Sequence, residues 1–216
     1  MFTAVEWLGH DGFRLRAGVT VYVDPWRIAG GDPADLIMIT HEHFDHCAPD
    51  DVRRLLGRNT NILGNAASIK LLKEAGVEAE MRVVKAGDEL EAAGVPVEVL
   101  PAYNTSKFRS PGVPFHPKEA GHVGYVFTVG DKRIYHTGDS DMVPEMRAVV
   151  CDILLVPVSG TYVMTADEAA EASRVVDPSG FSVPMHYGEI VGTEADALRF
   201  KELVGAEKVR ILSRTV

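Results

Sequence analysis

Cysteine, long apolar runs and an excess of positive charge are all scarce or missing in this sequence. Its 216 residues contain two cysteines, Cys47 and Cys151, which lie far apart and form no Cys-x-x-Cys pair. This count does not resemble a disulfide framework. No apolar run approaches the length of a membrane span. Lys and Arg number 22 against 31 Asp and Glu, and the resulting net charge of −9 argues against a protein that coats nucleic acid.

The length and composition indicate an ordinary soluble globule. The 216 residues suit one domain, residues 1–216, that is long enough to bury a full core, and 46% of them are hydrophobic and 25% charged. The first residues, Met1–Glu6, lack a basic region and a long apolar core, so we expect no signal peptide and a cytoplasmic location. The apolar strand residues leave room for an oligomer interface.

Periodicity and turn residues predict a strand-rich first part followed by alternating helices and strands. A Thr165-Ala166-Asp167-Glu168 capping box opens one of the helices. Strands are expected at 4–8, 12–16, 19–23, 36–40, 81–84, 95–100, 122–129, 133–136, 153–158, 183–186 and 208–212, and helices at 49–56, 66–75, 165–176 and 194–204.

The most informative segment is His41-Glu42-His43-Phe44-Asp45-His46, directly after the apolar run Leu36–Ile39. Imidazole and carboxylate are the ligands that zinc, manganese and iron use most. In extended backbone alternate side chains point the same way, so His41, His43 and Asp45 would line one side. His46 joins them if the chain turns after Asp45. The hexapeptide therefore predicts a site for divalent metal.

Two further polar groups follow predicted strands. Asp139 lies in a tight turn after the strand that ends at His136, and its two carboxylate oxygens could each bind one cation. His186 lies at another strand end, before Gly188. Each signal is weak alone, since the first is an ordinary turn and the second is more often a hydrogen-bonded core or surface histidine. His136 itself, inside a strand, is expected to be buried packing.

The hexapeptide, the later Gly-Asp-Ser and the final Pro-Met-His resemble the metallo-β-lactamase superfamily, in the same order and over about residues 5–190. Trp7-Leu8-Gly9-His10, Val23-Asp24-Pro25 and Tyr135–Asp139 are similar to the branch that contains ascorbate-phosphate lactonases and N-acyl-phosphatidylethanolamine phospholipase D. The resemblance implies an α/β (α+β) fold, a four-layer αββα sandwich of two mixed β-sheets flanked by helices. It also implies metals at one rim of the two sheets.

The resemblance further implies two divalent metal ions, Zn²⁺ first, with Mn²⁺ or Fe²⁺ as alternatives. Carried over by position, the first ion would be bound by two residues and the second by three, with one bridging carboxylate. These residues are His41 and His43 for the first ion, Asp45, His46 and His186 for the second, and Asp139 as the bridge.

Two other positions would orient the ligands through hydrogen bonds, His10 and Asp24. Equally, they could be a satisfied core histidine and a turn aspartate.

One position departs from the branch. A further histidine for the first metal is expected in a Pro-Ala-x-His context, but this chain has Pro101-Ala102-Tyr103-Asn104. His116, in Phe115-His116-Pro117, is our preferred replacement. His122 is the second candidate, although its place at a strand start favours a structural role. If neither histidine is a ligand, the first metal would be bound weakly.

Residues 103–121 form a long segment without a convincing period. It carries Phe108, Phe115 and the cations Lys107, Arg109 and Lys118. Loops that long in a compact domain are usually functional or disordered, and the aromatic content disfavours disorder. We interpret the segment as a substrate loop over the site. Cations facing the metals would favour an anionic phosphoester or lactone, whereas the alternative is that they are merely solvated.

A water shared by two divalent cations becomes hydroxide near neutral pH, and Asp45 would be the catalytic residue that orients it. The sequence thus predicts a metal-dependent hydrolase that cleaves an ester-like bond in a small molecule. A phosphodiesterase or nuclease competes within the hydrolases, but the acidic charge disfavours nucleic acid as a partner. A mononuclear metal oxygenase and a catalytically silent metal- or ligand-binding protein, which Asn104 would favour, are the alternatives.

Overall fold

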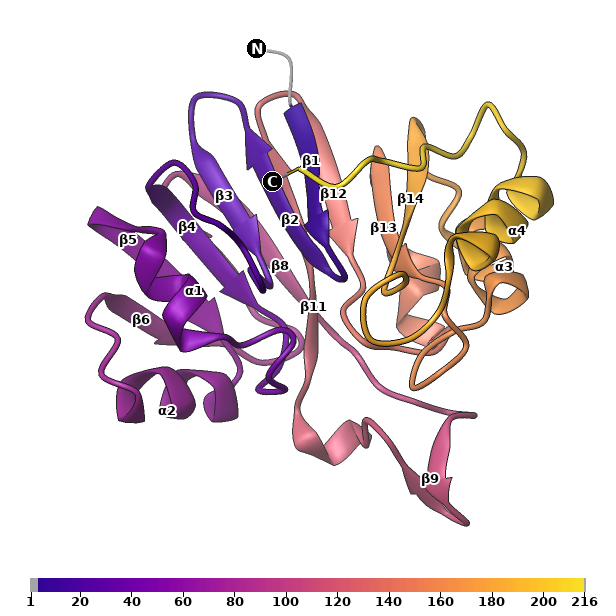
Figure 1. Cartoon of the computed structure of the whole chain (residues 1–216), viewed down its shortest axis with the longest axis horizontal. Coiled ribbons are helices and arrows are strands. Elements are labelled where there is room, and N and C mark those ends of the chain that lie inside the picture. Colours follow the sequence, from indigo (N-terminus) through magenta and orange to yellow (C-terminus); the bar gives the residue numbers. More distant parts are fainter. Residues whose placement is uncertain (1–3, 216) are drawn as a thin grey trace.

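Two six-stranded β-sheets pack against each other in the computed structural model, which describes residues 4–215. The first sheet has the order β1-β2-β3-β4-β5-β6 and the second the order β14-β13-β12-β11-β8-β7. Helices α1 and α2 cover the first sheet, and α3 and α4 lie against β13 and β14 of the second (Figure 1). The predicted four-layer αββα sandwich is confirmed.

The element bounds are as follows. The first sheet contains β1 (Ala4–Gly9), β2 (Gly12–Arg16), β3 (Thr20–Val23), β4 (Ala34–Ile39), β5 (Leu56–Gly64) and β6 (Glu80–Val83). The second contains β7 (Glu89–Ala92), β8 (Val95–Pro101), β11 (Val123–Val129), β12 (Lys132–His136), β13 (Ile153–Pro157) and β14 (Phe181–Met185). The helices are α1 (Pro49–Arg54), α2 (Ala66–Glu74), α3 (Ala166–Val176) and α4 (Glu194–Val204). None of the described helices is long and apolar enough to cross a membrane.

Residues Leu36–Ile39 of strand β4 are all apolar because both faces of the strand are buried there, whereas Asp35 near its start is exposed. Leu36 and Met38 belong to the core between the two sheets, whereas Ile37 and Ile39 pack under α1 and α2. Successive side chains of a strand point to opposite faces, so a central strand with a layer on each side needs apolar residues at every position. Its parallel neighbours β3 and β5 complete this arrangement.

The end of β4 is tied to the second sheet. The Tyr125 hydroxyl donates to the Ile39 carbonyl at 2.7 Å, and the Val123 N–H donates to the Thr40 carbonyl at 3.1 Å. Both donors come from β11, at the centre of the other sheet. These bonds fix the backbone that leads directly into the hexapeptide.

Helix α3 begins with the predicted capping box. The Thr165 hydroxyl accepts from the Glu168 N–H at 3.2 Å, and the Glu168 carboxylate accepts from the Thr165 N–H at 2.7 Å. The two side chains therefore satisfy backbone donors that the first turn of a helix leaves unpaired.

The prediction of a last strand at Lys208–Leu212 is wrong. Beside β14 there is one isolated bridge, between Ser182 and Val209, with the Ser182 N–H donating to the Lys208 carbonyl at 2.8 Å. Two residues further along β14 comes Pro184, which has no N–H to continue the ladder. The apolar pattern of 208–212 thus packs against the core without forming a strand.

Several expected boundaries also differ. The predicted helix 49–56 ends at Arg54, and Leu56–Gly64 forms β5, which the sequence analysis did not predict. Exposed Arg58 and Asn59 hide its strand pattern, and pairing with β4 outweighs their weak strand preference. Strand β7 and the hairpin of β9 (Phe108–Ser110) and β10 (Val113–Pro114) were not predicted either.

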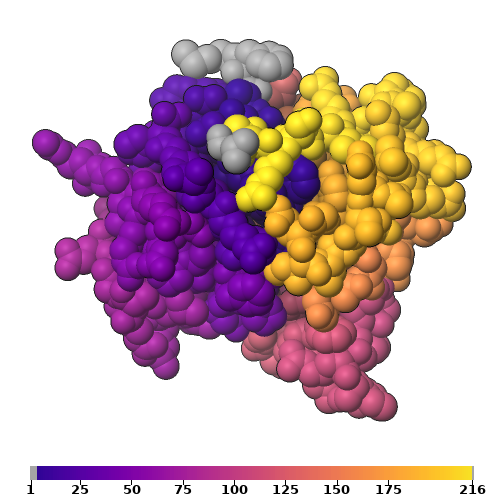
Figure 2. All heavy atoms as spheres, viewed as in Figure 1, coloured from indigo at the N-terminus to yellow at the C-terminus, as the bar shows by residue number. Residues whose placement is uncertain are grey.

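The hairpin of β9 and β10 projects from the end of the molecule below the two sheets, as Figures 1 and 2 show. It belongs to residues 103–121, the segment predicted to be a loop. Near the C-terminus, Arg214 donates to the carbonyls of Leu8 and Arg27 at 2.9 Å each. The C-terminal segment is thereby attached to the first sheet.

Candidate metal centre

Strands from both sheets end at one rim, and the predicted ligands follow these ends. The hexapeptide follows β4, Asp139 follows β12 and His186 follows β14. His10 follows β1 in the same way, and His116 reaches the rim from the long segment after β8. Because these carboxyl ends meet, residues far apart in the sequence form one buried cluster of histidines and aspartates.

One group of possible ligand atoms consists of His41, His43 and His116. One nitrogen from each ring lies within 4.8 Å of the other two, and His41 Nε2 is 3.0 Å from His43 Nδ1. His116 Nε2 also lies 3.4 Å from Asp139 Oδ2. The structure thus brings His116 to the place where a third imidazole for the first metal was expected.

Asn104 holds His116 from behind. The Asn104 Oδ1 atom accepts from the His116 backbone N–H at 2.8 Å and lies 3.0 Å from Nδ1 of the same ring. The Asn104 amide in turn donates to the Tyr162 carbonyl at 2.9 Å and to Asp141 at 3.2 Å. Asn104, which occupies the position where a histidine was expected, therefore orients the ring of His116.

His122, the second candidate, lies beside the cluster but faces another partner. Its ring centre is 4.7 Å from that of His41, whereas its Nε2 atom is 3.4 Å from Glu42 Oε2. The hydrogen bond from His122 lowers the pKa of Glu42 to about 2. His122 therefore fixes the hexapeptide through Glu42.

A second group surrounds His46 and His186. Asp45 and His10 join these two histidines in one set of atoms within 4.8 Å of one another, and Asp11 and Asp139 join them in an overlapping set. Asp139 Oδ1 is 3.4 Å from His46 Nε2, and Asp139 Oδ2 is 3.3 Å from His186 Nε2. Since Oδ2 also lies beside His116, the Asp139 carboxylate stands between the two groups.

The ring atoms that face away from the cluster have partners of their own. Nδ1 of His41 lies 3.0 Å from the Thr40 hydroxyl, Nδ1 of His46 lies 2.8 Å from Asp24, and Nδ1 of His186 lies 3.0 Å from the Ser159 hydroxyl. Metal-binding histidines are commonly held in this manner through their second nitrogen. His10 Nε2 contacts the Asp45 carboxylate at 3.1 Å.

The backbone around the cluster is strained. His10, Asp24 and His186 have φ values of 49°, 43° and 59°, in the left-handed region that residues other than glycine seldom adopt. Each such residue costs of order 1 kcal/mol or more. Gly138 also has a positive φ, 63°, and a side chain there would meet the Val123 carbonyl at 2.8 Å. The backbone conformation that places these residues in the cluster is therefore one that core packing alone would not favour.

The residues fit a bound cation. Within the described residues, five fully buried side-chain atoms of the cluster have no hydrogen-bond partner, namely His10 Nδ1, His46 Nε2, Asp139 Oδ1 and both carboxylate oxygens of Asp11. Buried polar atoms are almost always paired, because leaving one unpaired costs about 1–3 kcal/mol. Lone pairs of imidazole and carboxylate that converge on one space are the donor set of a divalent metal ion.

The protonation of the two groups differs. Burial and the neighbouring imidazole of His46 hold the pKa of His41 well below its usual value, and burial lowers the pKa of His116 to about 4. These rings are neutral at pH 7, the form that binds metal. Burial also opposes charge on His186, but Asp139 and Asp11 outweigh it and raise its pKa to about 9. The second group therefore attracts positive charge.

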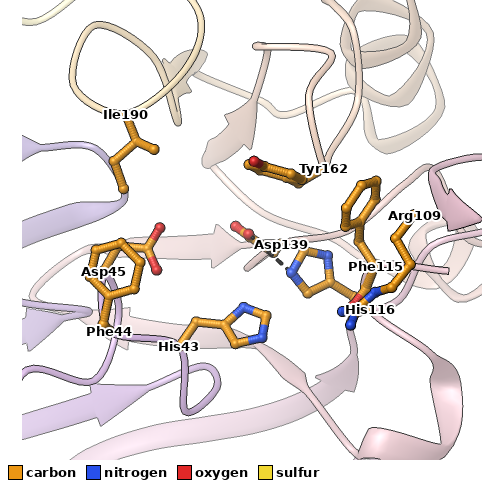
Figure 3. A pocket seen from close by; sticks show the side chains of 9 residues that line it. All are labelled: His43, Phe44, Asp45, Arg109, Phe115, His116, Asp139, Tyr162 and Ile190. Carbon is orange, nitrogen blue, oxygen red and sulfur yellow. Dashed lines mark hydrogen bonds and ion pairs between the residues drawn. The ribbon is translucent and has the colours of Figure 1, made fainter.

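A pocket of about 300 Å³ opens over the cluster. Its polar floor is formed by His43, Asp45, His116 and Asp139, and Figure 3 shows their side chains pointing toward its centre. The walls are mostly apolar, with one cation. They consist of Phe44, Arg109, Phe115, Tyr162 and Ile190.

Only part of the expected cation set reaches the pocket. Arg109 lines it, but Lys107 pairs with Glu168 at 2.6 Å and Lys118 pairs with Glu145 at 2.9 Å. Of the two alternatives that the sequence left open for the lysines, neither describes them fully, because carboxylates of neighbouring elements bind both side chains. They attach the long segment to the body of the molecule instead.

Three residues of the site were not predicted from the sequence. Asp11 was not considered, although it follows His10 at the end of a strand as the hexapeptide does. Tyr162 and Ile190 gave no signal, since their place on the pocket wall depends on how distant loops meet. His136 lies outside both groups, and its two ring nitrogens contact the Asp11 carbonyl and the Gly138 N–H.

Comparisons with known proteins agree with this geometry. A metal-dependent hydrolase of the UPF0173 group from Thermoplasma acidophilum is 32% identical over 216 aligned residues, covering 93% of this chain and 90% of the relative. The crystal structure of a proposed metal-dependent hydrolase from Parabacteroides distasonis has a TM-score of 0.83 and 30% identity, covering 98% of this chain and 94% of that one. A metallo hydrolase from Ignicoccus hospitalis, with a TM-score of 0.77 and 24% identity over 99% and 96% of the two chains, shares the fold.

The family model described as the beta-lactamase superfamily domain matches residues 4–186. This range contains the hexapeptide, Asp139 and His186, the residues on which the resemblance depended. The predicted resemblance is confirmed at this level, and the chain belongs to the beta-lactamase superfamily.

Proposed function

We propose that this metal-dependent hydrolase uses two divalent metal ions to cleave an ester-like bond in a small anionic substrate, such as a phosphoester or a lactone. The enzyme class agrees with relatives that are 30–32% identical over more than nine-tenths of the chain. The number of ions and the substrate class are the new elements of the proposal.

The position of Asp139 is the observation that carries the proposal. Its two oxygens lie 3.3–3.4 Å from imidazole nitrogens of both groups, His116 on one side and His46 and His186 on the other. A single carboxylate between two sets of ligands is suited to binding an ion on each side. We assign His41, His43 and His116 to the first ion, Asp45, His46 and His186 to the second, and Asp139 to both.

Two ions bound there supply Lewis-acid activation of water and of the substrate oxygen. The protein supplies the positioning. The Asp45 side chain is held by His10, lines the pocket and is 14% exposed, so its carboxylate is able to orient an attacking water. The proton of that water passes to the Asp45 carboxylate and on to solvent, or to the leaving group.

The pocket wall supports a small substrate with one anionic and one apolar part. No carboxylate within residues 4–215 pairs with Arg109, whose guanidinium contacts the Phe115 carbonyl at 3.2 Å and is free to bind an anion. Phe44, Tyr162 and Ile190 add apolar surface to the same pocket. A guanidinium binds phosphate or carboxylate in a fork, which favours a phosphoester or an acidic lactone.

Metal analysis and a substrate panel test the proposal together. We would measure the metal content per chain of protein purified without chelator, for the parent, His116→Ala and Asp139→Ala. The parent is expected to hold about two ions, His116→Ala about one, and Asp139→Ala one or none. Full metal content and activity in Asp139→Ala would contradict the bridging role.

The panel would contain a phosphodiester, a phosphomonoester and lactones with and without a negative charge, with Asp45→Asn as the control for catalysis. Turnover that is lost in Asp45→Asn while the fold is retained supports hydrolysis. One ion per parent chain, with no turnover of any ester, would favour instead the mononuclear or the silent metal-binding function.

A further inference from the structure

Asp11 is a buried carboxylate without a visible partner. It follows His10 at the turn between β1 and β2, and its side chain has no exposed surface. Within the described residues, neither of its oxygens accepts a hydrogen bond. Burying a charged carboxylate without compensation costs several kcal/mol, and a positive charge beside it would remove that cost.

The atoms that face Asp11 are ring nitrogens of the second group. Asp11 Oδ2 lies 3.8 Å from His46 Nε2 and 3.9 Å from His186 Nε2. Nδ1 of each ring is already held, by Asp24 and by Ser159, so Nε2 is the atom left for the centre of the group.

These separations are too long for hydrogen bonds but suit ligands that share one ion. Two ligands that each lie about 2.1 Å from a metal can be at most about 4.2 Å apart. Asp11 Oδ2 meets this limit toward both His46 and His186. His10 Nε2 lies 3.4 Å from Asp11 Oδ2, but it lies closer to Asp45 Oδ2, at 3.1 Å.

We infer that Asp11 is a ligand of the second metal ion, in addition to Asp45, His46, His186 and Asp139. This inference rests on the proposed pair of ions. It makes the two sites chemically different, because the first has three imidazoles and one carboxylate, whereas the second has two imidazoles and three carboxylates.

The difference in ligands gives the two sites different metal preferences. Imidazole suits zinc well, whereas carboxylate oxygens suit harder cations such as Mn²⁺. With Asp11 bound, the second site therefore accepts Mn²⁺ or Fe²⁺ better than the first site does, and the protein in its native state is able to hold two different metals.

The test compares metal binding by the parent, Asp11→Asn and Asp51→Asn. Asp51 is a suitable control because it is also a buried aspartate, but it contacts the Arg27 N–H and the Arg54 side chain instead of the cluster. Each protein is stripped with a chelator, dialysed, checked by circular dichroism, and titrated with Zn²⁺ and separately with Mn²⁺ in a calorimeter.

The parent and Asp51→Asn are expected to bind two ions, with Mn²⁺ entering one site more tightly than the other. Asp11→Asn is expected to keep the first Zn²⁺ with unchanged affinity and to bind the second ion, Mn²⁺ above all, at least about tenfold more weakly. If Asp11 serves only to pair with protonated histidines, the variant will bind both ions as tightly as the parent or more tightly, and the inference is overturned.

A parent that binds a single ion would instead refute the proposed pair of ions, so the two failures are distinguishable. A second test of the assignment requires no variant: manganese is located by anomalous scattering in crystals of the parent protein. An ion within about 2.3 Å of an Asp11 oxygen supports the assignment. An ion bound by Asp45, His46 and His186 with Asp11 outside its coordination sphere overturns it.

Discussion

Replacing Asn104 by alanine should weaken the first metal site without touching a ligand. In the native structure a single atom, Asn104 Oδ1, pairs with both the backbone N–H and the ring of His116. The substitution leaves two donors of a buried residue without their acceptor. At about 1–3 kcal/mol for each unsatisfied group, and with water recovering part of that, the free energy of unfolding should fall by about 2–4 kcal/mol.

The effect on metal binding follows from the loss of ring orientation. Removing the partner that holds a metal-binding histidine typically weakens binding 10- to 100-fold, which corresponds to about 1.4–2.8 kcal/mol. The loss should be confined to the first site, because none of the hydrogen bonds of the Asn104 side chain reaches His46 or His186. Titration of the stripped protein with Zn²⁺ would then show one weakened ion and one unchanged ion.

Ser106→Ala is the matched control. Ser106 also bonds to Asp141 near the start of the long segment, through its N–H at 2.6 Å and its hydroxyl at 3.0 Å, but it forms no hydrogen bond with His116. It should lower stability slightly and leave both metal affinities unchanged. If Asn104→Ala binds two ions as tightly as the parent, Asn104 does not position His116. Equal weakening in both variants would mean that the segment as a whole, not this amide, sets the affinity.

Three further predictions concern the surroundings of the site. Lys107→Met removes the ion pair between the long segment and Glu168 on α3, so KM for an ester that the enzyme hydrolyses should rise about three- to tenfold with kcat nearly unchanged. Lys118 is more exposed, so Lys118→Met should have a smaller effect. A large fall in kcat for Lys107→Met would show that the segment acts in the chemical step. His136→Ala removes a buried ring that bonds two backbone groups, so urea denaturation should show a loss of about 2–4 kcal/mol with metal content retained, and loss of metal at full stability would contradict its structural role. Burial raises the pKa of both Cys47 and Cys151 to about 12, so both are neutral thiols at pH 8. The native protein should therefore react with a thiol reagent far more slowly than the urea-unfolded protein. Rapid labelling of two thiols in the native state would refute this.

The hexapeptide could be recognised from the sequence because its ligands are contiguous. A run of His41, His43, Asp45 and His46 after an apolar strand needs no knowledge of the rest of the chain to suggest a metal. The continuous apolar character of Leu36–Ile39 also predicted a strand buried on both faces, since both faces of β4 are covered by other layers. Order along the chain then gave weight to Asp139 and His186, which are weak signals alone.

Other parts of the site depend on contacts that the sequence does not contain. The meeting of Asn104 and His116 requires the chain to turn back through the β9–β10 hairpin, and residues 103–121 have no period that would predict this. Asp11 differs from an ordinary turn aspartate only in the absence of partners, which is a property of the folded structure. The wrong prediction of a strand at 208–212 has a similar origin, because the neighbouring strand β14 contains Pro184 and cannot extend the ladder of hydrogen bonds.

The hydrogen bond from the His186 N–H to the His10 carbonyl, at 3.1 Å, has a consequence for biosynthesis. The proposed ligands of the first ion lie between residues 41 and 139, so all of them are available once the ribosome has released the first two-thirds of the chain. The second set spans residues 11 to 186 and is incomplete until β14 has been made and has closed against β1. Closing so long a stretch of chain is a slow, late event in folding. We therefore expect the two ions to enter in order during maturation, the first once the ends of β4 and β12 have come together, and the second only after β14 has been made and lies beside β1.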